Sequence, residues 1–185
     1  KDNGEVYMSE QKNQKGKYRN YILAITGLAV FNFLFLGTEY FFDDRMAELV
    51  PAGRVVWAQS IFLTVSAAGF LVYPILKHYR GSRQGMVMQI ISGVICMLSI
   101  WMMTGNRSER SLLIWGCVFF LFAGMYGSKV HDQAANILKN SNHMALMVGT
   151  AYAAGLLLQF VNNNLITDNR IQVSMLLIFV VIFVI

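Results

Sequence analysis

The sequence predicts an all-α membrane protein with six transmembrane helices. Hydrophobic residue types make up 56% of the 185 residues and charged types 14%, whereas a soluble domain has about 25% charged residues. The apolar residues form long runs, and the charged residues form short clusters between them, which is typical of an integral membrane protein. The net charge is +5, but most basic residues flank the apolar runs. The charge therefore indicates membrane topology, and we expect no direct nucleic-acid binding by this segment.

The first twenty residues are polar and hold five basic residues. We expect residues 1–20 to form a disordered basic tail in the cytoplasm. Met8 opens the stretch Met-Ser-Glu-Gln-Lys, and our hypothesis is that translation of the natural protein starts there. Residues 1–7 would then be translated leader, and a native peptide spanning residues 1–12 would contradict this.

Six apolar runs follow the tail and define a six-span membrane domain over residues 21–185. The expected spans are 21–42, 55–76, 84–104, 111–128, 144–162 and 171–185. The first would be about 33 Å long as a helix, enough to cross a hydrocarbon core of about 30 Å. It is too long for a signal peptide and has no small-residue cleavage site. The last run would reach only about 22 Å, so we expect the sequence to be cut inside its sixth span.

Small residues and a proline mark several spans. The second span contains Pro74, where we expect a kink. Small residues spaced for close helix contact occur in the fourth span at Gly116, Gly124 and Gly127, and in the fifth at Gly149, Ala151, Ala153 and Gly155. Residues 129–143 are polar, and we interpret them as a cytoplasmic stretch that can extend the preceding helix.

The distribution of basic residues predicts the orientation. If the tail is inside, the inner segments are 1–20, 77–83 and 129–143, and they hold ten Lys and Arg. The outer segments, 43–54, 105–110 and 163–170, hold five. By the positive-inside rule we expect a cytoplasmic N-terminus and a multi-pass protein of the cell (plasma or inner) membrane.

The sequence offers no pattern typical of an enzyme. It has no glycine-rich phosphate loop, no nucleophile elbow and no metal-ligand spacing. Cys96 and Cys117 lie in different apolar runs and are interpreted as small membrane-core residues. We therefore expect no catalytic residue, no metal and no cofactor.

Polar side chains within apolar runs are the remaining candidates, because such residues are costly in lipid and mark helix contacts or water-filled cavities. The candidates for a substrate or ion pathway are Asn32, Glu39, Gln59, Tyr152 and Gln159. Asn32 and Glu39 are two helical turns apart and share a face. Glu39 is either a proton or cation site facing a cavity, or an interfacial glutamate that reaches solvent. The amide and phenol side chains either line a cavity or bond a neighbouring helix.

The loop between the second and third spans carries a family resemblance. It holds Lys77, His78, Arg80, Gly81 and Arg83 and no acidic residue. The major facilitator superfamily of transporters has its signature in this loop, and Gly81 and Arg83 fall on the second glycine and a basic position of that signature. His78 stands where the family has its aspartate. The Ala123–Gly127 segment is similar to the glycine-rich fourth span of the family.

The chain thus resembles the N-terminal six-helix half of a major facilitator transporter. The resemblance implies two six-helix halves that rock around a site near the membrane midplane, moving a small solute by alternating access. It implies as partners the lipid bilayer, a solute whose transport can be coupled to protons, and either a C-terminal half or a second copy. The loop residues 77, 78, 80, 81 and 83 would then gate the inner side.

Two other functions stay open. Membrane sensor domains of LuxR-type helix-turn-helix transcription regulators look similar, and the few charges within the spans fit such a sensor. A membrane-embedded enzyme is a third hypothesis, but it requires an intramembrane catalytic set that the sequence does not offer.

Overall fold

The computed structural model describes the backbone of residues 2–79, 82–105, 107–138 and 144–184, and the side chains of residues 16, 18–79, 87–105, 107–138 and 144–184. The described backbone is helical apart from short connections. The elements in chain order are α1 (Asp2–Ala47), α2 (Ala52–Tyr79), α3 (Ser82–Gly105), α4 (Glu109–Leu138), α5 (Met144–Phe160), a π-helical turn η1 (Val161–Leu165) and α6 (Asn169–Val184).

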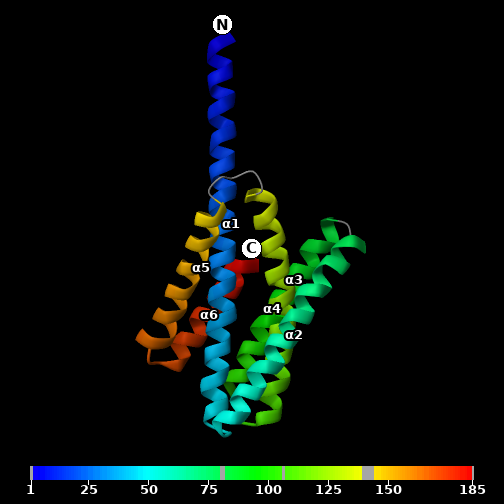
Figure 1. Cartoon of the computed structure of the whole chain (residues 1–185), viewed down its shortest axis with the longest axis vertical. Helices are drawn as coiled ribbons and strands as arrows, with labels where there is room; N and C mark the ends of the chain where they lie inside the picture. Colours follow the sequence, from blue (N-terminus) through cyan, green and yellow to red (C-terminus); the bar gives the residue numbers. More distant parts are fainter. Residues whose placement is uncertain (1, 80–81, 106, 139–143, 185) are drawn as a thin grey trace.

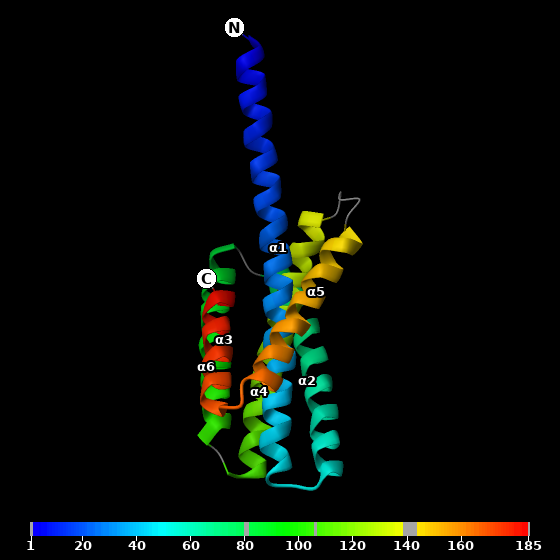
Figure 2. The same ribbon diagram turned by 90° about the vertical axis from the view of Figure 1, so that its left-hand side faces the viewer.

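The helices run alternately up and down in one bundle (Figure 1). The ends of α2 and α4 and the starts of α3 and α5 lie at one end, which we call the tail end because the N-terminal part of α1 projects from it (Figures 1 and 2). The other end, where α1 and α3 finish, is called the far end. The described parts of the three segments that the sequence predicts to be inner therefore lie on the side of the tail end.

Five helices are long and apolar enough to cross a membrane, and α6, with 16 residues, is a shorter apolar helix. Helices suit this environment because every backbone hydrogen bond is made within the segment. Exposed Leu71, Leu146 and Leu157, each at least 66% accessible, are suited to lipid contact. The prediction of a multi-pass helical membrane protein is confirmed at this level.

The structure differs from the expected boundaries in two places. Residues 2–20 continue α1, where the sequence analysis expects a disordered tail. An existing helix adds residues cheaply, and the Lys, Gln and Glu residues of this stretch are good helix formers. Helix α4 continues ten residues past the expected end of the fourth span, to Leu138. Pro74, where we expect a kink, lies within α2.

The helices pack in a pattern that repeats after three elements. Helix α2 packs mainly on α4, and α5 packs mainly on α1. Helix α3 packs on α4 as α6 packs on α1, and the two central helices, α1 and α4, contact each other. Helices α3 and α6 lie together at one edge of the bundle (Figure 2). In this pattern α1 corresponds to α4, α2 to α5 and α3 to α6. The main contacts of the first three helices recur when each helix is replaced by its counterpart.

Glycines allow α2 and α4 to approach closely. A Cβ atom at Gly69 would run into the backbone carbonyl of Leu121, and one at Gly124 would run into the backbone of Ser66. Backbone atoms in a packed helix cannot move aside as the end of a flexible side chain can. The crossing of α2 and α4 therefore requires glycine at both positions.

Helices α2 and α4 are also joined by ion pairs near both ends. Arg54 pairs with Glu109 at 2.8 Å at the far end, and Lys77 pairs with Asp132 at 2.6 Å at the tail end. All four side chains are partly exposed, and exposed ion pairs stabilise little. The ion pairs fix the register of the two helices, whereas close packing holds them together.

We expect Gly124→Leu to destabilise the protein strongly. The new side chain would collide with the backbone of Ser66, and overpacking typically costs about 1–3 kcal/mol. Thermal unfolding and gel filtration in detergent measure the effect. Gly149→Leu is the matched control, because a Cβ atom there meets nothing within 4 Å. Equal stability of the two variants would contradict the close crossing.

Candidate functional site

Asn32 lies at the contact between α1 and α5. Its side chain is 7% exposed, and its Nδ2 donates a hydrogen bond to the carbonyl of Leu28 at 3.0 Å. A Cβ atom at Gly155 would meet Asn32 and the carbonyl of Ala29. The amide of Asn32 thus bonds its own helix at a point where α5 approaches α1 closely.

Gln59 and Glu39 lie near the far end of the bundle. The Nε2 of Gln59 donates to a carboxylate oxygen of Asp43, which joins α2 to α1. Glu39 is half-buried and precedes Asp43 by one helical turn, so the two acids share a face of α1. The structure therefore places two of the predicted pathway residues beside one acidic site at the far end.

The two predicted residues of α5 lie at different depths. Gln159 is 8% exposed, and Asn162, in the π-helical turn after it, is 2% exposed. The Oδ1 of Asn162 is buried without a hydrogen-bond partner in the described residues. Tyr152 is 39% exposed and belongs to a different group of side chains near the tail end.

The predicted gating loop is described in part. Lys77 pairs with Asp132 of α4, and the ring of His78 packs on that of Tyr79 at 5.2 Å. Arg80 and Gly81, and the side chain of Arg83, lie outside the described residues. The ion pair of Lys77 with Asp132 joins the start of this loop to α4.

Sequence reasoning missed His131, which it placed in a cytoplasmic loop or at a span end. The extension of α4 places this partly buried side chain between helices, where its Nδ1 lies 2.7 Å from the carbonyl of Gly127 and its Nε2 lies 2.9 Å from the hydroxyl of Tyr152. The rings of Phe31 and Phe70 lie 5.5 and 5.8 Å away. These partners come from α1, α2 and α5, so His131 joins four helices.

Gly127 makes this arrangement possible. A side chain at this position would collide with the rings of Phe31 and Phe70. Its carbonyl can only accept a hydrogen bond, so Nδ1 of His131 carries a proton. The remaining nitrogen, Nε2, faces a hydroxyl that can either donate or accept. The Nε2 of His131 can therefore be either the donor or the acceptor of its hydrogen bond with Tyr152.

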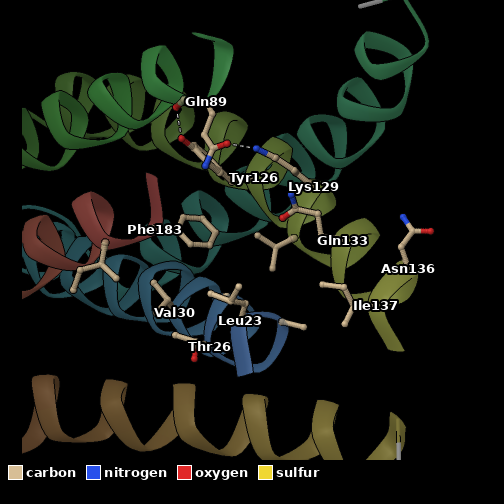
Figure 3. Close-up of a pocket in the computed structure, with 14 residues that line it drawn as sticks. Leu23, Thr26, Val30, Gln89, Tyr126, Lys129, Gln133, Asn136, Ile137 and Phe183 are labelled. Carbon is tan, nitrogen blue, oxygen red and sulfur yellow. Dashed lines mark hydrogen bonds between the residues drawn. The ribbon is translucent and has the colours of Figure 1, made fainter. Parts of the chain in front are cut away.

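A cavity of about 660 Å³ lies near the tail end on another side of α4 (Figure 3). Its wall on α4 carries Lys129, whose Nζ donates to the side-chain carbonyl of Gln89 on α3. The hydroxyl of Tyr126 donates to the backbone carbonyl of Gln89, and the Nε2 of Gln89 donates to the carbonyl of Val184 at 3.1 Å. Gln89 thus ties α3 to α4 and α6 at the base of the cavity.

Within the described residues, no group of three or more His, Cys, Asp or Glu side chains is placed to hold a metal ion. Comparison of the chain with protein-family models, with curated proteins and with solved structures gives no match.

The His131 geometry predicts an unusual neutral tautomer, with the proton on Nδ1 and a bare Nε2. Nitrogen NMR of protein with labelled histidine, in a variant that replaces His78 and His143 with Gln, distinguishes the two neutral forms. We expect the form protonated on Nδ1 at high pH. The chemical shift of Nε2 should change in the Tyr152→Phe variant, because this variant lacks the hydroxyl that bonds to Nε2. A neutral form protonated on Nε2 would contradict the bond to Gly127.

Proposed function

We propose that the chain is the N-terminal six-helix half of a secondary transporter of the major facilitator type, with its N-terminus in the cytoplasm. It would move a small solute by alternating access, together with a second six-helix unit in the same protein or a second copy. The observation that supports this best is the repeated packing of α1–α3 and α4–α6. Inverted repeats of this kind are a common basis of secondary transporters.

The repeat extends to individual contacts. Gly69 of α2 packs on the carbonyl of Leu121 in α4, and Gly155 of α5 packs on the carbonyl of Ala29 in α1. Helix α2 corresponds to α5 and α4 to α1, so these are equivalent contacts in the two units. The corresponding helices run in opposite directions (Figure 1). This supports an inverted repeat, because equivalent glycines lie at equivalent crossings.

Helices α1, α2, α4 and α5 together position His131, and we propose that this residue binds the coupling proton. Protonation at Nε2 would place a positive charge close to two phenylalanine rings, and aromatic rings within about 6 Å stabilise a cation. Among the described hydrogen-bond and ring partners of His131, only Tyr152 is ionisable, and α1 and α2 contribute the apolar Phe31 and Phe70. Its neighbours on α4, Lys129 and Asp132, bond to Gln89 on α3 and to Lys77 on α2. The proton on His131 would therefore be the variable charge of this site.

Solute uptake by the full-length protein in proteoliposomes tests the function. A mixture of metabolites is supplied with an imposed pH gradient, and the contents of the vesicles are analysed by mass spectrometry. We expect at least one solute to accumulate above the level of empty vesicles. Binding of a solute without accumulation would instead favour the sensor of a LuxR-type regulator.

We expect His131→Gln to abolish the stimulation of uptake by the pH gradient. Glutamine keeps a polar side chain at this position but has no group that takes up a proton at physiological pH. His143→Gln is the matched control, since it removes another histidine of the chain, one without a proposed role in transport. Uptake by His131→Gln that still follows the gradient would exclude His131 as the proton site.

Glu39 is tested in the same assay. If Glu39 exchanges protons in the pathway, Glu39→Gln should slow gradient-driven uptake, because the amide cannot release a proton. The neighbouring substitution Asp44→Asn provides a control, since Asp44 is exposed on the same helix. Unchanged uptake and unchanged pH dependence in Glu39→Gln would assign Glu39 to the membrane interface.

A further inference from the structure

The cavity beside Lys129 combines a cationic group with apolar walls. Its polar residues lie mainly along one edge of α4, where Lys129, Gln133 and Asn136 follow one another (Figure 3). The apolar lining comes from α1, α4 and α6: Leu23, Ala24, Val30, Val130, Ile137, Ile182 and Phe183. A ligand that fits both parts has an anionic group and a hydrocarbon chain.

The ammonium group of Lys129 has more hydrogen-bond donors than Gln89 uses. An ammonium group has three donors, and one of them is used by Gln89. In the part of the chain that the structure describes, the ion pairs of lysine and arginine with carboxylates involve Arg45, Arg54 and Lys77, and Lys129 forms none. A partly buried cation without a carboxylate partner attracts an anion.

The surroundings of the cavity indicate where the anion comes from. Two of the aliphatic residues that line it are exposed: Leu23 of α1 is 61% exposed, and Ile182 of α6 is 50% exposed. In a membrane these side chains face lipid. The cavity is lined by the last turns of α4 and the start of α3, which lie at the tail end, where Lys77 and Lys129 also lie. A hydrocarbon chain can therefore enter sideways from the bilayer while its headgroup stays at the level of the basic residues.

We propose that this cavity binds an anionic phospholipid of the leaflet at the tail end, with its phosphate at Lys129. Gln133 and Asn136 lie beside the headgroup, and one acyl chain lies against Leu23 and Ile182. A zwitterionic lipid fits less well, because no carboxylate pairs with Lys129 or is among the cavity-lining residues to bind the cationic end of its headgroup. The lipid joins α1, α4 and α6, and its binding does not depend on transport activity.

Native mass spectrometry of the full-length protein tests the proposal. The protein is exposed to equal amounts of dioleoyl phosphatidylglycerol and dioleoyl phosphatidylcholine, and the retained lipids are counted. We expect the natural protein to retain one phosphatidylglycerol in preference. Lys129→Gln should reduce this preference about fivefold, because a lysine near anionic headgroups contributes about 1 kcal/mol. Lys77→Gln, a lysine at the same end that is already paired with Asp132, should bind as the natural protein does.

A second variant and a labelling measurement on the natural protein keep the test decisive if Lys129→Gln does not fold. Thr26→Trp keeps the charge but fills the cavity from α1, and it should also lose the bound lipid. Photoactivatable phosphatidylglycerol should label residues 23–30 or 129–137 of the natural protein.

Three outcomes would overturn the proposal. The first is an unchanged preference in Lys129→Gln together with labelling elsewhere, and the second is an equal loss in Lys77→Gln. The third is displacement of the ligand by excess inorganic phosphate, which would indicate a site for a free anion.

Discussion

The contact between α2 and α4 is the constraint on which the rest of the bundle depends. The backbones of the two helices touch at Gly69 and Gly124, where any side chain would collide with the opposite helix. This crossing fixes α4 beside α2, and α4 then carries α3 on its other side. The ion pairs at the two ends of the crossing are partly exposed and add register rather than strength. Close backbone approach is favourable in lipid because helices there associate by packing, without a hydrophobic driving force between them.

The same crossing explains how polar side chains of α4 that are close in sequence bond to different helices. Helix α4 lies between α2, α3 and α1, so successive side chains at its tail end meet different neighbours. Lys129 reaches Gln89 on α3, His131 reaches Tyr152 on α5, and Asp132 reaches Lys77 on α2. The proposed proton site and the proposed lipid site can therefore lie within one turn of each other and still face different neighbouring helices.

The spans could be predicted from the sequence because hydrophobic length alone identifies them, and five of the expected six correspond to helices long enough to cross a membrane. Composition could not predict where α4 ends, since residues 129–138 mix polar and apolar side chains and become part of the bundle through contacts with α1, α2, α3 and α5. Tyr152 was identified as polar within a span, but its partner His131 is 21 residues away and on another helix. The partners of Lys77 and Gln89 are likewise distant in sequence, 55 and 40 residues along the chain. Such pairings follow from how the helices pack, which the hydrophobic pattern leaves open.

The most direct measurement is solid-state NMR of the protein in lipid, with carbon labels at the glycine Cα and the serine carbonyl positions. The close crossing predicts a through-space cross-peak between Gly124 and Ser66, which disappears when Ser66→Ala removes the label. Absence of this cross-peak in the natural protein would mean that α2 does not cross α4 at these residues. The repeat of the two three-helix units, and the transporter function proposed from it, would then lose their structural basis.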